Sequence, residues 1–136
     1  MMRRLAWLGK YRDIGLLCMR LGLGVMFIFH GTPMLMGGPD RWAGLGQEMA
    51  NLGITVAPVA WGFLAALSEA GGGVCLILGL FTRPACAMLL ATMGVAVVHH
   101  LAAGEDLMQA SHAIEDGVVF LGLIFLGPGR FSLDRT

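Results

Sequence analysis

Residues 58–80 read PVAWGFLAALSEAGGGVCLILGL, and this stretch decides the class of fold. It contains a single charged residue, Glu69. A helix needs about 20 predominantly apolar residues to cross the hydrocarbon core of a bilayer, which is about 30 Å thick. The stretch therefore predicts a transmembrane helix.

Three further apolar segments accompany it, at residues 14–30, 84–101 and 107–126. Each reaches spanning length once flanking residues are included. The connection before residue 84 is too short for anything but an antiparallel neighbour. We therefore expect one domain over residues 1–136, an all-α integral membrane protein built as an up-and-down bundle of four transmembrane helices.

The composition agrees with this class and excludes another. Hydrophobic residues make up 57% of the chain and charged residues only 13%, against about 25% charged in soluble domains. The formal net charge is zero, so the chain lacks the basic surface that nucleic acid requires. We expect the lipid bilayer, and no nucleic acid, as its partner.

A short amphipathic helix is expected at residues 41–52, between the first two spans. Gly53 ends a pattern of apolar residues at helical spacing: Trp42, Leu45, Met49 and Leu52. Such a helix lies in the membrane interface, with Trp42 as its anchor. The first ten residues are expected to lie similarly on the other side.

The distribution of basic residues predicts the orientation. Seven of the nine Lys and Arg residues fall on the side of the predicted bundle that carries both termini: Arg3, Arg4, Lys10, Arg12, Arg83, Arg130 and Arg135. Arg41 falls on the opposite side, and Arg20 lies within a span. Loops rich in Lys and Arg remain in the cytoplasm. Both termini are therefore predicted to be cytoplasmic.

Three charged residues, Arg20, Glu69 and Glu115, lie where lipid would otherwise be. Each costs roughly 2.5–3.5 kcal/mol at the centre of a spanning helix, so we expect Arg20 to pair with one of the carboxylates. The carboxylates stand at similar heights, each eleven residues before the end of its segment. Two interpretations remain open: a network that fixes the packing of the bundle, or a proton or ligand site.

Four histidines gather at the side opposite the termini: His30, His99, His100 and His112. Thr92 shares a helix face with His99, and His112 shares one with Glu115. We take His30, His99, Thr92 and His112 as candidate ligand-binding residues, although either His99 or His100 could face the interior. No pattern of metal-ligand spacing is present, and Cys18, Cys75 and Cys86 are expected to be buried small apolar residues.

Several motifs together resemble the DoxX family of bacterial membrane proteins. They are MRLG at 19–22, FIFHG at 27–31, SEAGG at 68–72, LGLFTR at 78–83 and LGPGRFSLD at 126–134. The family's motif positions fall on Arg20, His30, Gly31, Glu69, Gly72, Thr82, Arg83, Glu115, Gly129 and Arg130, with His99 or His100 in the third helix.

The resemblance implies a four-helix protein of the bacterial inner membrane, some of whose relatives are subunits of a quinone-linked oxidoreductase. The function expected first is therefore a redox subunit that binds quinone or relays protons, with Glu69, Glu115 and Arg20 as catalytic residues. No haem, flavin or iron–sulfur motif is present, so electrons are expected to come from a partner or an external donor. The alternatives are a scaffold for a membrane or redox partner protein, and a proton or small-ion transporter acting as a homo-oligomer.

Overall fold

The computed structural model describes residues 5–134 and is helical almost throughout. Its elements are η2 (Ala6–Tyr11), α1 (Arg12–Met36), α2 (Gly38–Gly46), η3 (Gln47–Leu52), α3 (Pro58–Leu78), α4 (Thr82–Ala102) and α5 (Leu107–Leu126). Four helices are long and apolar enough to cross a membrane: Ala6–Met36, Pro58–Leu78, Thr82–Ala102 and Leu107–Leu126. The predicted four-helix membrane fold is confirmed.

The first helix is longer than expected. The apolar segment 14–30 predicted an end near residue 30, but α1 continues to Met36 with Pro33 inside it. A proline removes only one backbone hydrogen bond, and here it stands in the last turn before Gly37. His30 consequently lies within α1 and not at its end.

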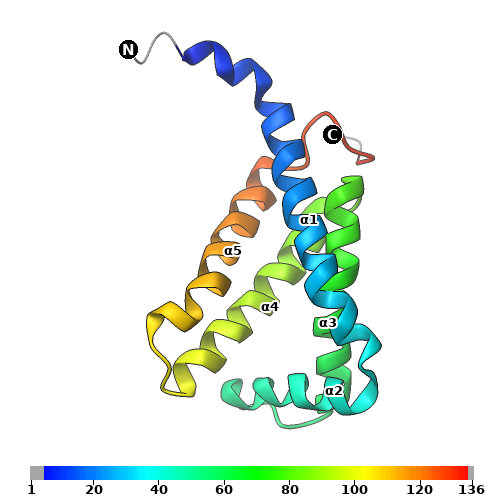
Figure 1. Cartoon of the computed structure of the whole chain (residues 1–136), viewed down its shortest axis with the longest axis vertical. Helices are drawn as coiled ribbons and strands as arrows, with labels where there is room; N and C mark the ends of the chain where they lie inside the picture. Colours follow the sequence, from blue (N-terminus) through cyan, green and yellow to red (C-terminus); the bar gives the residue numbers. More distant parts are fainter. Residues whose placement is uncertain (1–4, 135–136) are drawn as a thin grey trace.

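The bundle has two ends of different construction (Figure 1). The terminal end carries η2, the turn between α3 and α4, and the chain after α5. The distal end carries the turn between α4 and α5, and α2 with η3, which lie across it. In the view of Figure 1, α1 and α5 diverge towards the distal end. The helix predicted at 41–52 is present as α2 and η3, and Gly53 ends it with a φ of 80°.

Glycines bring α1 and α3 into close contact. A Cβ atom on Gly24 would lie 2.7 Å from the carbonyl oxygen of Gly73, and one on Gly73 would lie 2.6 Å from that of Gly24. Close backbone approach of this kind is how membrane helices pack. Two other glycines of α1, Gly15 and Gly22, face open space.

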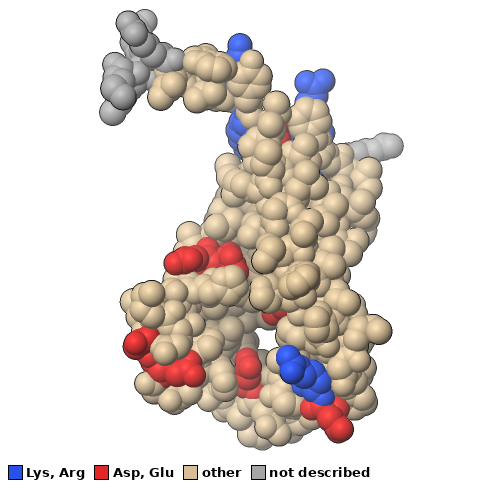
Figure 2. Space-filling view, viewed as in Figure 1, with Lys and Arg blue, Asp and Glu red and all other residues tan. Residues whose placement is uncertain are grey.

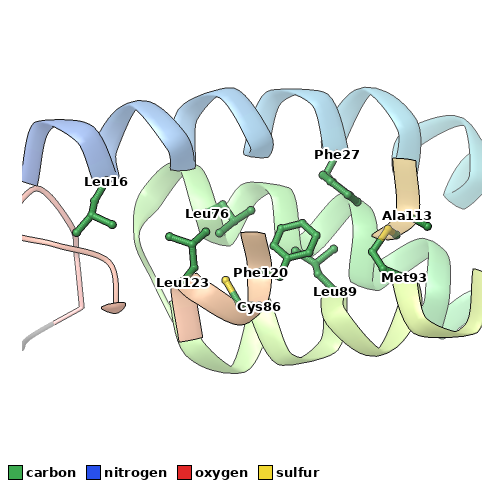
Figure 3. Packing of buried hydrophobic residues seen from close by; sticks show 9 residues of the cluster. All are labelled: Leu16, Phe27, Leu76, Cys86, Leu89, Met93, Ala113, Phe120 and Leu123. Atoms are coloured by element: carbon green, nitrogen blue, oxygen red, sulfur yellow. The ribbon is translucent and has the colours of Figure 1, made fainter. Parts of the chain in front are cut away.

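An apolar core joins the four helices between the two ends. Phe27 of α1 and Phe120 of α5 meet edge to face with ring centroids 5.1 Å apart, a preferred arrangement for aromatic pairs. Figure 3 shows the core residues: Leu16, Phe27, Leu76, Cys86, Leu89, Met93, Ala113, Phe120 and Leu123. This layer separates the polar groups of the terminal end from those of the distal end.

Candidate functional site

The charged residues divide between the two ends of the bundle. Figure 2 shows acidic side chains gathered over the distal half and basic ones at the terminal end, with one basic side chain at the distal end. Lys10, Arg12, Arg83 and Arg130 belong to the terminal end, and Arg41 lies on α2. These positions agree with the predicted division of Lys and Arg residues between the two sides of the bundle. Arg3, Arg4 and Arg135 lie outside the described residues.

Arg20 does not pair with a carboxylate, contrary to the expectation from the sequence. Its guanidinium is fully buried and donates to the carbonyl oxygens of Leu76, at 3.4 Å, and Phe131. The carboxylate of Asp134 is near enough to attract it. The long side chain points towards the terminal end, where the chain after α5 folds back over it. Arg20 therefore belongs to the architecture of that end and not to a site with Glu69 or Glu115.

The chain after α5 is held against the start of α4 by Asp134. Its carboxylate accepts hydrogen bonds from the backbone N–H groups of Phe81, at 2.7 Å, and Thr82, at 2.9 Å. Burial acts to raise the pKa of Asp134, but these bonds and the nearby Arg20 outweigh it and lower the pKa below its ordinary value. The end of the LGPGRFSLD motif is thus a helix cap supplied from a distant part of the chain.

A cavity of about 340 Å³ lies at the distal end, among the end of α1, α2, η3, α3 and α4. Its walls are mainly apolar, and four side chains supply carboxyl or hydroxyl groups: Glu48, Ser68, Glu69 and Thr92. Leu64 and Met88 also line the cavity, although 43% and 48% of their surface is exposed. The cavity thus opens between α3 and α4 on the side that would face lipid.

Two hydroxyl groups lie together in the cavity wall. Thr92 Oγ1 is 2.9 Å from the carbonyl oxygen of Met88 and 3.3 Å from Ser68 Oγ, and it can donate its one hydrogen to either. When Thr92 donates to Met88, the Ser68 hydroxyl can donate its hydrogen either to Thr92 Oγ1 or to a molecule in the cavity. Thr92, a predicted site residue, therefore belongs to the site, and it is joined by Ser68, which the sequence did not single out.

The two cavity carboxylates come from different elements. Glu69 is contributed by α3 and Glu48 by η3, and both line the cavity. Burial raises the pKa of Glu48, while His99 and His100 oppose the change. His99 also lies 3.2 Å from the amide nitrogen of Asn51. His99 thus stands at the edge of the site, where it ties α4 to η3.

The remaining predicted residues lie elsewhere. Glu115 is exposed, whereas its neighbour Asp116 is half-buried. His30 and His112 face each other from α1 and α5, with ring centroids 6.0 Å apart. None of these residues lines the cavity.

Sequence reasoning missed Glu48, Ser68 and Asp116. Glu48 stands off the apolar stripe of residues 41–52, which could have marked it as the polar side of a helix that covers the bundle. Ser68 is adjacent to Glu69, and Asp116 is adjacent to Glu115. Side chains of adjacent residues on a helix point about 100° apart. The positions expected for Glu69 and Glu115 therefore did not indicate which way Ser68 and Asp116 point.

The cysteines are free and belong to the terminal half of the bundle. Cys86 is buried as expected and Cys75 partly so, but Cys18 is exposed. Within residues 5–134, no three His, Cys, Asp or Glu side chains come close enough together to hold a metal ion. The polar chemistry available at the distal end is therefore that of carboxyl, hydroxyl and imidazole groups.

Comparison with known proteins places the chain in a family. The DoxX family profile matches residues 15–101. The chain is 33% identical to the inner membrane protein YphA of Escherichia coli K12, with 93% of each protein covered. It is 30% identical to the inner membrane protein YqjF of the same organism, covering 93% of this chain and 94% of YqjF. No solved structure matches. These likenesses and the four spanning helices support a multi-pass protein of the bacterial inner membrane, and the chain belongs to the DoxX family.

Proposed function

We propose that this protein binds the headgroup of a lipid-soluble quinone in the distal cavity and exchanges protons with it through Glu69, as the membrane subunit of a redox system. The observation that carries the proposal is the cavity itself. It has mainly apolar walls, opens towards lipid, and brings two carboxyl and two hydroxyl groups together. Small-molecule sites combine these properties, with volumes of about 300–1,000 Å³.

The polar groups of the cavity suit the carbonyl oxygens of a quinone. The Ser68 hydroxyl would donate one hydrogen bond, and a protonated carboxyl on Glu69 would donate a second. The exposed side chains of Leu64 and Met88 at the mouth would allow an isoprenoid tail to remain in lipid. A quinone would supply two-electron redox chemistry, and Glu69 would hold or release the accompanying proton. Electrons would come from a partner protein.

Titration of the purified protein in nanodiscs with a short-chain quinone tests this proposal. Glu69→Gln and Thr92→Val should each weaken saturable binding at least tenfold, about 1.4 kcal/mol, without lowering thermal stability. Glu115→Gln is the matched control, because it removes an exposed carboxylate at a similar predicted height. The absence of saturable binding by wild type, or an equal loss in the control, would contradict the proposal.

A lipophilic cation serves as a second probe in the same titration. No Lys or Arg lines the cavity, and its two carboxylates would attract a positive charge. If tetraphenylphosphonium binds saturably and quinone does not, the transporter interpretation replaces the redox one. If quinone binds and the cation does not displace it, the redox proposal stands.

We also infer that both termini face the cytoplasm, which places the cavity at the outer half of the membrane. The basic residues of the terminal end support this orientation. In a background without the native cysteines, Asp40→Cys should react with an impermeant thiol reagent in intact cells, whereas Thr136→Cys should not. The reverse labelling pattern would place the cavity at the cytoplasmic half.

A further inference from the structure

The short 3₁₀ segment η3 closes the distal side of the cavity. It lies across the distal end of the bundle (Figure 1), and its residues Glu48 and Met49 line the cavity. η3 is six residues long, whereas 3₁₀ runs longer than about three or four residues are uncommon because their hydrogen-bond geometry is poor. A 3₁₀ stretch within a helical segment often marks a hinge. We therefore considered whether η3 can move.

The helix before η3 is fixed to the bundle. A Cβ atom on Gly46 would lie 1.6 Å from the carbonyl oxygen of Pro58, and one on Gly62 would lie 1.6 Å from that of Trp42. The backbones of α2 and α3 are therefore in direct contact. The Trp42 ring also meets Phe63 edge to face, with centroids 4.9 Å apart. Movement at the distal end is consequently expected in η3 and not in α2.

The chain after η3 does not fix its other end. Gly53 has a φ of 80°, a left-handed conformation that glycine adopts without strain, and no helix is present from there to Pro58. The backbone bonds at this point run from Gly53 to Ala50 and from Ile54 to Met49, so they are local to η3. The attachment of η3 to the helices beside it therefore depends on side chains.

One hydrogen bond joins η3 to α4 within residues 5–134. It connects Asn51 Nδ2 and His99 Nδ1, at 3.2 Å. The same Nδ2 atom donates to the backbone carbonyl of Glu48, at 3.0 Å. A carbonyl oxygen only accepts, so the amide atom that faces it must be the nitrogen, and its second hydrogen points to His99. Nδ1 must therefore accept, which requires a neutral imidazole with its hydrogen on Nε2.

Protonation of His99 disrupts this arrangement. It places a hydrogen on Nδ1, which can then no longer accept from Asn51. Turning the Asn51 amide would bring its oxygen to His99, but it would also set that oxygen against the carbonyl oxygen of Glu48. One of the two hydrogen bonds is lost in either orientation. The attachment of η3 to α4 is thus complete only while His99 is neutral.

We propose that η3 is a lid over the distal cavity and that protonation of His99 releases it. Release opens the cavity to water at the distal end, whereas the mouth between α3 and α4 faces lipid. Histidine is the side chain whose charge ordinarily changes between about pH 5 and pH 8, so acidification of the distal side opens the lid. Control of quinone access rests on the function proposed above, but the release itself does not depend on a ligand.

Other titratable groups surround His99. His100 follows it on α4, with ring centroids 5.9 Å apart, and is paired with Glu105. Glu69 lies in the cavity wall on α3. Glu48 on η3 attracts a protonated His99 and so opposes release. Burial raises the pKa of Glu48, so acidification also removes this attraction earlier than it would for an exposed carboxylate.

Distances between spin labels, measured by double electron–electron resonance, test the lid in nanodiscs without quinone. The labels replace Ala50 on η3 and Val118 on α5 in a background without the native cysteines, and both positions are exposed. The fraction of molecules at a second, longer distance should rise about fivefold between pH 8 and pH 5, as expected for the loss of one hydrogen bond.

Three variants assign this response to its residues. His99→Asn places an amide oxygen where Nδ1 was, so it should accept from Asn51 at either pH and keep the open fraction low. Asn51→Ala removes the donor and should make the open fraction high already at pH 8. His100→Asn is the matched control, because it removes the adjacent imidazole, which makes no hydrogen bond to η3 within residues 5–134. It should keep the wild-type response.

The outcomes separate the lid from the proposed function. A pH response that persists in His99→Asn or Asn51→Ala, or that disappears in His100→Asn, would overturn the lid mechanism. A single unchanged distance in wild type at both pH values would overturn it as well, even if quinone binds. The expected responses, together with no saturable quinone binding by wild type, would support the lid and remove the quinone. Thermal unfolding of each variant verifies that the compared proteins are folded.

Discussion

The two ends of the bundle use charged side chains in opposite ways. At the terminal end, three charged side chains bind backbone groups in the first or last turn of a helix. Arg20 donates to a carbonyl in the last turn of α3, Arg83 donates to Ile124 of α5 at 2.8 Å, and Asp134 accepts from the start of α4. Helix ends leave such groups unpaired and carry complementary partial charges. These charges are therefore part of the architecture.

At the distal end, the carboxylates have no comparable partners. Asp106 caps α5 by accepting from Met108 at 3.0 Å, but Glu48, Glu69 and Asp116 form no ion pair with a described Lys or Arg. They lie around a cavity and at the inner end of a histidine pair. The comparison teaches that the presence of a buried charge does not identify a site. What identifies it is a buried charge without a fixed partner beside open space.

The largest effect on stability is expected from Arg20→Leu at the terminal end. It leaves two backbone carbonyls without a charged donor, and each such bond contributes about 1.5–3 kcal/mol. We expect the free energy of unfolding in mixed micelles to fall by about 3 kcal/mol. Combining the change with Glu69→Gln should give additive losses. If Glu69→Gln instead restores stability to Arg20→Leu, the two residues interact, and the charges of the two ends are not independent.

Asp134→Asn should have an intermediate effect, about 1 kcal/mol, because it weakens the cap of α4. The pKa of Asp134 is lowered on folding, so its stabilisation is fully present above the unfolded pKa of about 3.9. It is lost as the pH falls through the lower folded pKa. The difference in unfolding free energy between wild type and variant should therefore become smaller as the pH falls from 6 to 3. A constant difference over that range would mean that the carboxylate charge does not contribute.

The smallest effect, with the opposite sign, is expected from Glu48→Gln at the distal end. Burial raises the pKa of Glu48, so its contribution to stability is fully present below the unfolded pKa of about 4.3. It is lost as the pH rises through the folded pKa. At neutral pH the variant should be more stable than wild type, by less than about 1 kcal/mol because the group is only partly buried. If Glu48→Gln is less stable than wild type at neutral pH, the Glu48 carboxylate stabilises the fold, as the charged side chains of the terminal end do.

The sequence predicted the parts of the fold that depend on local composition. Spans of sufficient apolar length appear wherever the sequence is apolar, because the bilayer requires satisfied backbone groups and a helix supplies them within one segment. The amphipathic stripe of residues 41–52 predicted α2 and η3 for the same local reason. The extension of α1 beyond residue 30 was missed, because the apolar segment ends there, whereas α1 continues through Pro33 to Met36.

The site was predicted only in part. Counting residues from the helix ends placed Glu69 deep in the membrane, and the structure places Glu69 and Thr92 in the cavity wall. The same counting predicted a partner for Arg20 that the structure does not provide. Rise along a helix gives height, but it does not give the direction of a long side chain or the path of the chain after α5.

The sequence by itself determined that this chain crosses a membrane four times and that its acidic and basic residues separate between two ends, because hydropathy and charge are properties of single residues. Only the tertiary structure decided which charged side chains have fixed hydrogen-bond partners. The carbonyl groups of residues 76 and 131 accept from Arg20 through packing between distant segments, while η3 and α3 place Glu48 and Glu69 in the wall of one cavity. Such contacts depend on how helices rotate and dock against one another. The division between architectural and chemically available charges therefore appears only in the folded molecule.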